Sequence, residues 1–150
     1  MRSKLLQRLV SAAVLSAALP LAWGQAHVAE SGVHTMRASV TPSAALATET
    51  ARAHGIDVAA DRGIVNVVVL ERGDAGQRPV PAEVSATRTD LAGRPETIEM
   101  REIRANGGIS YLGTFTVLTS PTARFRISAR PAKAGQPLTI EFEERFHVSR

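Results

Sequence analysis

The chain has 150 residues, enough for one domain of ordinary size, and its composition excludes several classes of protein. It contains no cysteine, so neither a disulfide nor a cysteine-linked lipid anchor can form. The formal net charge of +4 would suit a nucleic-acid-binding protein, but Arg2, Lys4 and Arg8 belong to an N-terminal segment that we expect to be removed. The remainder has fifteen basic and fourteen acidic residues, a net charge of +1, so we expect no nucleic-acid partner.

Residues 1–24 have the three-part layout of a secretory signal peptide. The basic residues precede an apolar stretch that is broken at Pro20, well short of the roughly 20 apolar residues that a membrane-spanning helix needs. Small residues favour cleavage near Gly24-Gln25, with a cut before His27 as the alternative. We therefore expect a periplasmic protein without a membrane span after cleavage, in which residues 25–32 are a flexible lead-in to the folded domain.

The longest β-branched apolar run of the mature chain, Gly63 to Leu70, is predicted to be the central strand. Both of its alternating sets of side chains are apolar: Ile64, Val68 and Leu70 on one side, and Val65, Val67 and Val69 on the other. Asn66 is the one polar interruption. Both faces of this strand should therefore be at least partly covered.

Six other segments alternate or are rich in β-forming residues and are predicted strands: Val33–Val40, Val80–Arg88, Thr97–Arg104, Ile109–Leu118, Ala123–Ala129 and Leu138–Val148. The pattern reverses at Glu102-Ile103, which suggests a bulge. The segment from Glu71 to Pro81 is rich in glycine and proline and is predicted to be a loop.

One short helix is expected between the first two strands, within 44–54 and ending at Gly55. Thr41 could cap a long form, but we favour a shorter helix that begins at Glu49 with Thr48 as its cap. Asn106-Gly107 is the strongest turn signal, because both residues accept the positive φ angles of a type I′ hairpin.

Seven short strands punctuated by glycine and proline predict a mainly β, single-domain immunoglobulin-like β-sandwich over residues 33–150. A small closed β-barrel is the alternative. Four of the five aromatic residues of the mature chain lie in the last three strands and should form the aromatic part of the core: Phe115, Phe125, Phe142 and Phe146.

No catalytic, cofactor-binding or metal-ligating residues can be assigned from the sequence, and no cofactor is expected. The four histidines, His27, His34, His54 and His147, fall in separate elements without the short spacing of a metal site. The serines lack the G-x-S-x-G context of a hydrolase. Arg124 and Arg126 face the same way as Glu141 and Glu143, which predicts a solvated cross-strand ladder of charges rather than an anion site.

Three motifs together resemble a known family: Thr48 to Ile56, Arg62 to Leu70 and Arg101 to Arg104. They are similar to small exported proteobacterial proteins grouped as domain of unknown function 4426, over nearly all of the mature chain from about Val33. His54 and Ser110 stand where a tyrosine is usual in that family. The resemblance implies an exported protein of this extent and brings no activity and no site residues.

The hypothesis that fits these observations is a non-catalytic periplasmic interaction or envelope-associated module, with another envelope protein as its partner. The alternative is a small periplasmic hydrolase or ligand-binding protein whose site is assembled from separated arginine, glutamate and histidine residues, for which His34, Glu102 and Arg104 are the candidate surface. We expect the strand Val33–Val40 either to be an exposed edge for docking or to pair within the fold.

Overall fold

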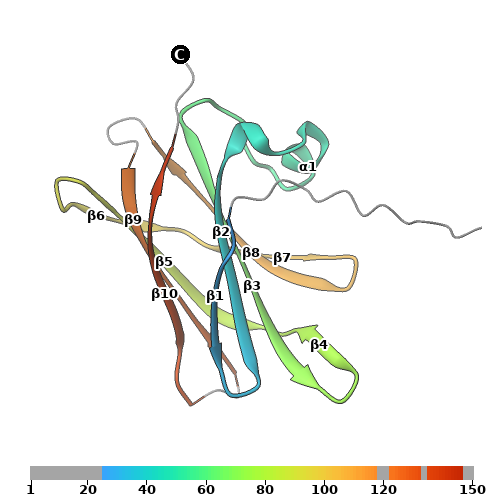
Figure 1. Cartoon of the computed structure of the whole chain (residues 1–150). Coiled ribbons are helices and arrows are strands. Elements are labelled where there is room, and N and C mark those ends of the chain that lie inside the picture. Colours follow the sequence, from blue (N-terminus) through green and yellow to red (C-terminus); the bar gives the residue numbers. More distant parts are fainter. Residues whose placement is uncertain (1–24, 118–121, 133–134, 147–150) are drawn as a thin grey trace, which may run out of the picture.

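A computed structural model describes residues 25–117, 122–132 and 135–146; the expected signal peptide lies outside these ranges. The described chain forms two antiparallel β-sheets that face each other, with one short helix at one end of the first sheet (Figure 1). None of its helices is long and apolar enough to cross a membrane.

The strands divide between a larger sheet, called sheet A, and a smaller one, sheet B. Sheet A has the order β1 (His27–Ser31), β2 (His34–Pro42), β3 (Arg62–Gly73), β8 (Gly108–Thr116) and β7 (Arg101–Ala105), and β4 (Gly76–Pro79) pairs with the end of β3. Sheet B has the order β10 (Leu138–Arg145), β9 (Thr122–Pro131), β5 (Ala82–Asp90) and β6 (Pro95–Ile98). Across the described strands, none of sheet A pairs with one of sheet B, so the predicted β-sandwich is confirmed and the closed barrel is excluded.

The core lies between the sheets and is centred on β3, as the apolar run predicts. Val65, Val67 and Val69 point inward and are fully buried. Burial of each such side chain stabilises the fold by about 1.5–3 kcal/mol relative to exposure. The four predicted aromatic residues do pack together, with Phe115 and Phe125 5.2 Å apart and Phe125 and Phe142 5.5 Å apart between ring centroids, and Phe146 against the first two.

The second apolar side of β3 faces away from the core, on the outer face of sheet A. The helix α1 (Thr48–Ala53) and its flanking residues cover only one end of this face. Ala51 and Ile56 pack there on Ile64, and Leu46 and Leu112 complete this second, smaller hydrophobic cluster. Coverage of both sides of β3 is thus confirmed, but on the outer side it is incomplete, because six helical residues are too short to span a strand of twelve.

The helix has nearly the predicted length but a different beginning. It starts at Thr48, with Ala47 at the capping position and no side-chain cap, so the prediction that Thr48 caps it is wrong. Its end is the predicted one: Gly55 has φ +62°, the Gly55 N–H donates to the Arg52 carbonyl, and the Ile56 N–H donates to the Ala51 carbonyl at 2.8 Å. This is the hydrogen-bond pattern of a Schellman motif, and it turns Ile56 back onto the sheet.

The structure corrects three sequence predictions. The lead-in 25–32, expected to be flexible, contains β1, which pairs with β2. Of the two alternatives for Val33–Val40, this pairing supports the second: the strand pairs within the fold and is not an exposed edge. The expected loop 71–81 contains the β3–β4 hairpin. The single strand expected at Thr97–Arg104 is divided at Glu99 and Met100, where the chain crosses from sheet B to sheet A, so the pattern reversal marks a change of sheet and not a bulge.

The strongest local predictions are confirmed. Asn106 and Gly107 have φ angles of +50° and +74° and join β7 to β8, with Ala105 opposite Gly108. In the predicted charge ladder, Arg126 donates to Glu141 at 2.6 Å across β9 and β10, and both side chains are half exposed or more. His147 and Val148 lie outside the described residues.

Candidate functional site

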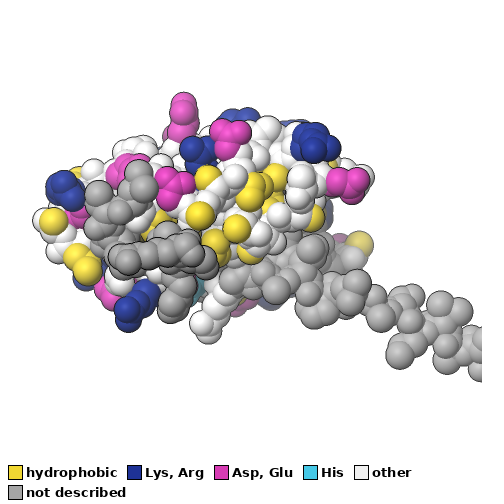
Figure 2. Space-filling view, turned by 90° about the horizontal axis from the view of Figure 1, so that it is seen from above, with side chains coloured by type: hydrophobic (Ala, Val, Ile, Leu, Met, Phe, Trp, Pro, Cys, Tyr) yellow, Lys and Arg dark blue, Asp and Glu magenta, His cyan; other side chains and the backbone are white. Residues whose placement is uncertain are grey.

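The outer face of sheet A carries the largest of the apolar hollows described here, which we call the α1 pocket. It has a volume of about 320 Å³ and lies between the helix and the sheet. Its lining comes from the helix and its flanks (Leu46, Thr50, His54, Ile56), from β2 and β3 (Thr41, Ile64, Asn66, Val68) and from β7 and β8 (Ile103, Ala105, Ser110, Leu112). Seen from the end of the molecule that carries α1, hydrophobic side chains gather in the middle of the surface with charged ones around them (Figure 2).

Hydrogen bonds fix the walls of the α1 pocket. The fully buried Ser43 donates to the Ala59 carbonyl at 2.8 Å and accepts from the Ala59 N–H at 3.0 Å, which ties together the two ends of the excursion that contains the helix. On the other side, the Arg101 guanidinium of β7 donates to the His54 carbonyl at the helix C-terminus at 3.0 Å. A cation at that end also interacts favourably with the helix dipole. The pocket is therefore formed before any ligand enters.

Uncharged polar side chains are set into this apolar lining. Asn66 lies on the floor, on β3, and Ser110 on the neighbouring strand β8, both half-buried. Neither side chain makes a hydrogen bond to any residue in the described ranges. Among the residues that the structure describes, no arginine, lysine, aspartate or glutamate lines the pocket. Mostly apolar walls with a few polar groups that can orient a guest are typical of small-molecule sites, whose volumes begin at about 300 Å³.

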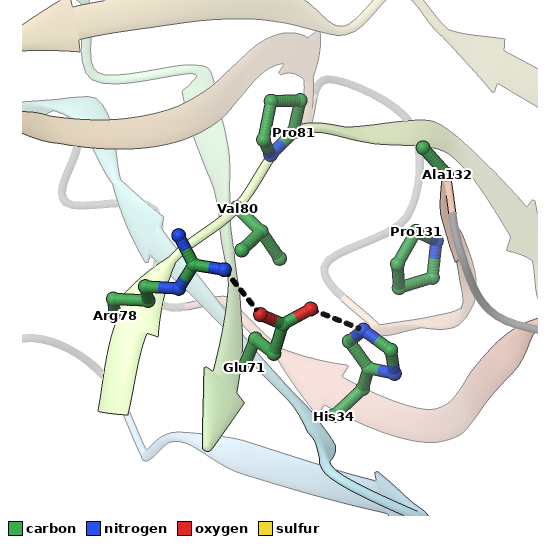
Figure 3. A pocket seen from close by; sticks show the side chains of 7 residues that line it. All are labelled: His34, Glu71, Arg78, Val80, Pro81, Pro131 and Ala132. Atoms are coloured by element: carbon green, nitrogen blue, oxygen red, sulfur yellow. Dashed lines mark hydrogen bonds and ion pairs between the residues drawn. The ribbon is translucent and has the colours of Figure 1, made fainter. Parts of the chain in front are cut away.

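A second, smaller hollow, the His34 pocket, lies where the β3–β4 hairpin passes into sheet B. It has a volume of about 190 Å³. Figure 3 shows its lining: a row of three polar side chains, His34, Glu71 and Arg78, faces the apolar side chains Val80, Pro81, Pro131 and Ala132. Glu71 stands in the middle of that row. Arg78 donates to one of its oxygens at 2.5 Å, and His34 Nε2 lies 3.4 Å from the other.

The polar side chains that the structure describes in the His34 pocket interact with one another and leave no charged group among them free for a ligand in the hollow. The hydrogen bond from Arg78, together with the positive charge of Arg78 and a smaller effect of His34, holds the pKa of Glu71 below its ordinary value, although partial burial opposes this shift. Glu71 is therefore a carboxylate at neutral pH. The pocket's described lining residues include no hydroxyl or thiol group that His34 could activate as a nucleophile. The contacts among His34, Glu71 and Arg78 therefore explain the stability of the β3–β4 hairpin better than they explain a catalytic role.

Glu102 and Arg104, the other two residues of the predicted surface, pair on β7. Arg104 donates to Glu102 at 2.5 Å, and the buried Tyr111 donates to the second Glu102 oxygen at 3.1 Å. Tyr111 also accepts from the Ala82 N–H of sheet B at 2.8 Å, so this network joins the two sheets. The hydrogen bond from Arg104 lowers the pKa of Glu102, and burial raises the pKa of Tyr111.

The structure thus brings Glu102 together with Arg104, while His34 lines a pocket to which neither contributes. Across residues 25–117, 122–132 and 135–146, no three histidine, aspartate or glutamate side chains are grouped so as to hold a metal ion.

The α1 pocket is the feature that the sequence predictions missed. One signal for it was available: Ile64, Val68 and Leu70 are apolar although they lie opposite the core side of β3, and the short helix could cover only part of them. The polar interruption Asn66 falls on this same face, opposite Ser39 of β2 and Leu112 of β8.

Comparisons with known proteins agree with this fold. The family described as Domain of unknown function (DUF4426) matches residues 29–149. A solved DUF4426 family protein from Pseudomonas aeruginosa PAO1 superposes with a TM-score of 0.70 and 26% sequence identity, over 83% of this chain and 97% of that chain. No curated protein matches the sequence.

Two more distant structures are of FetP from uropathogenic Escherichia coli strain F11. FetP as isolated after expression in the periplasm has a TM-score of 0.55, and a copper-bound FetP variant has 0.54; each is 12% identical, and they cover 85% and 84% of this chain and 96% of their own. At that identity the likeness shows the fold alone. The family match covers most of the chain and includes the three motifs that suggested the same family, so this protein belongs to the DUF4426 family, a domain of unknown function.

Proposed function

We propose that the protein is an exported, non-catalytic binding module of the periplasm that receives an apolar group in the α1 pocket. The observation that carries this proposal is the pocket itself: a preformed hollow of about 320 Å³ with mostly apolar walls, on a sheet face that would ordinarily be polar. The signal-like residues 1–24 and the fold shared with the periplasmically expressed FetP support the proposed compartment.

The polar clusters support a binding role over a catalytic one. Glu71 and Glu102 are each held as carboxylates by an arginine, and Tyr111 is engaged in joining the sheets. A general acid or base needs a pKa near the working pH, and the lowered pKa values of these two glutamates move them away from it. An envelope protein as a further partner remains part of the proposal.

Titration with a neutral fluorescent probe, N-phenyl-1-naphthylamine, tests the pocket. We expect saturable fluorescence enhancement with one site on the chain that begins at Gln25. Ser110→Phe should abolish it, because the added ring fills the hollow from its β8 wall. The matched control is Ser85→Phe, which places the same ring at an exposed position on β5 in sheet B. Both variants should keep the far-ultraviolet circular dichroism of a β protein.

The outcome against the proposal is equally specific. If the probe fails to bind the folded wild-type protein, or if Ser85→Phe and Ser110→Phe weaken it equally, the α1 pocket is not a binding site for an apolar group.

A further inference from the structure

We infer that the ligand of the α1 pocket is an anionic amphiphile with a single alkyl chain, whose tail enters the pocket and whose acidic head is bound by Arg37. This inference rests on the proposed function and adds the chemical class of the ligand. It comes from a second hollow that adjoins the first.

The second hollow extends the apolar surface away from the helix along the same face. It has a volume of about 270 Å³ and is lined by Ala26, Arg37, Ala38, Ser39, Asn66, Val68 and Leu70. Asn66 and Val68 line both hollows, so the two adjoin at these residues and form one groove. From Val68, which lies opposite Arg37, to Ile64 beneath the helix is four residues of β3, about 13 Å at the rise of a strand. The groove thus runs along β3 over a length that an alkyl chain can follow.

The two ends of this groove differ in charge. The described residues that line the end under the helix include no arginine, lysine or acidic residue. Beyond Ile56 and Leu112 this end adjoins a polar hollow, whose two arginines are engaged: Arg62 pairs with Asp57, and Arg101 donates to the His54 carbonyl. Arg37 lies at the open end, is exposed, and forms no ion pair or hydrogen bond through its side chain with any residue that the structure describes. The neighbouring acid on β1, Glu30, accepts instead from Thr35 at 3.5 Å. A cation left unpaired beside an apolar groove favours a ligand with a negative charge at one end.

The polar groups along the groove offer no second site for the acidic head. The side chains of Ser39, Asn66 and Ser110 have no hydrogen-bond partner among the described residues and are spaced along the groove and not gathered at one point. They form no anion site, so the acidic head is expected at Arg37 and not on the floor. Their amide and hydroxyl groups can remain hydrated or bind a polar substituent on the chain.

Calorimetric titration with three ligands that each carry a twelve-carbon chain tests the inference. Each ligand is kept below the concentration at which it forms micelles or separates from solution. Laurate carries a carboxylate, dodecanol is neutral, and dodecyltrimethylammonium is a cation. We expect laurate to bind about two- to fivefold more tightly than dodecanol, as an exposed ion pair allows, and the cation to bind most weakly. Added salt should reduce the advantage of laurate and leave dodecanol unchanged.

Arg37→Gln tests the contribution of the acidic head to affinity separately from that of the alkyl tail. It should lower the affinity for laurate to that for dodecanol and leave dodecanol binding as it was. The matched control is Arg130→Gln, which removes an equally exposed arginine from β9 on the opposite sheet and should change neither affinity.

Failure of this inference is distinct from failure of the proposed function. If laurate and dodecanol bind equally and Arg37→Gln has no effect, the charge of the ligand is wrong while the pocket stands. If neither ligand binds while N-phenyl-1-naphthylamine still does, the alkyl-chain class is wrong and the pocket stands. If the fluorescent probe fails to bind as well, the pocket itself is wrong. Sedimentation with phosphatidylglycerol vesicles, with retention that Arg37→Gln abolishes, would reassign Arg37 to a membrane surface and overturn the single-chain ligand.

Discussion

At the scale of single residues, the same side-chain types have different roles because their partners differ. His34 is buried beside a carboxylate on β3, whereas His54 lies in the lining of an apolar pocket, where its backbone carbonyl accepts from Arg101 and its backbone N–H donates to the Thr50 carbonyl. Arg78 pairs with Glu71, whereas Arg37 has no described partner. In a chain in which sixteen of the eighteen basic residues are arginine, the residue type therefore gives no indication of role. Arg37 is informative because it lacks a described partner and also lines an apolar groove.

Glu71 gives a residue-scale prediction for the dependence of stability on pH. Its pKa is lowered in the folded state, chiefly by the hydrogen bond from Arg78. Its contribution to stability is therefore present above the ordinary value of 4.5 and is lost as the pH falls through the lower, folded value. We expect Glu71→Gln to lower the urea midpoint at pH 7, and the difference from the wild type to vanish as the pH falls well below 4.5.

The control for this prediction is Glu83→Gln, which alters an exposed carboxylate on β5 that makes no ion pair with a described residue. It should leave the urea midpoint within error of the wild type at every pH. A constant difference between Glu71→Gln and the wild type from pH 7 to pH 3 would show that the ion pair with Arg78 is not the cause.

At the scale of elements, neighbours decide the role of each strand. The segment that contains β2 reads as a short, weakly charged strand next to the N-terminus, which fits an edge as well as an interior position. Pairing with β1 on one side and β3 on the other makes it interior. β1 itself is too short and irregular in pattern to stand out as a strand. It is ordered against β2, and His27 stacks on Phe142 of β10 with ring centroids 3.7 Å apart.

The β7–β8 hairpin gives a prediction at this scale. Gly107 has φ +74°, a region that a β-branched residue occupies only with strain. Gly107→Val should therefore lower the free energy of unfolding by about 1–2 kcal/mol. Gly135→Val is the control, because Gly135 has neither a positive φ nor an atom within 4 Å of its added Cβ. Chemical denaturation of both variants is the measurement. Equal stability of the two would contradict the assignment of strain to the turn.

At the scale of the whole molecule, the excursion that carries α1 makes the two outer faces unlike. Sheet B presents alternating charged and small polar side chains to solvent, among them the Arg126–Glu141 pair. The outer face of sheet A is apolar along β3. The helix α1 covers one end of this apolar surface, and the other end is uncovered. This difference between the two outer faces suits the proposed binding role. The core between the sheets provides the stability, and the outer face of sheet A is left free for a ligand.

Removal of the expected signal peptide gives a prediction at the scale of the whole chain. We expect the mature protein to begin at Gln25 and to contain no tryptophan, because Trp23, the single tryptophan, precedes the cleavage site. Intact-mass measurement of the periplasmic fraction checks this, with the absence of tryptophan fluorescence as an independent sign. A mass that retains Met1 to Trp23 would overturn both the location and the net charge of +1.

The sequence by itself determined the features that depend on local chemistry. The strand β3 follows from its run of β-branched residues, the hairpin from the backbone freedom of Asn106-Gly107, and the end of the helix from Gly55. The sandwich and its aromatic core follow from the alternation of apolar and polar side chains. Each of these signals lies within a few residues of the structure that it specifies.

Only the tertiary structure decided which segments lie side by side. The position of His34 beside Glu71 and the groove from the helix to Arg37 both bring together residues that are distant in sequence. The division of Thr97–Arg104 between two sheets depends on which strand each half pairs with. Periodicity shows which side of a strand is apolar but not what covers it. The α1 pocket exists because a helix of six residues covers only one end of β3, and that geometry appears only when the chain is folded.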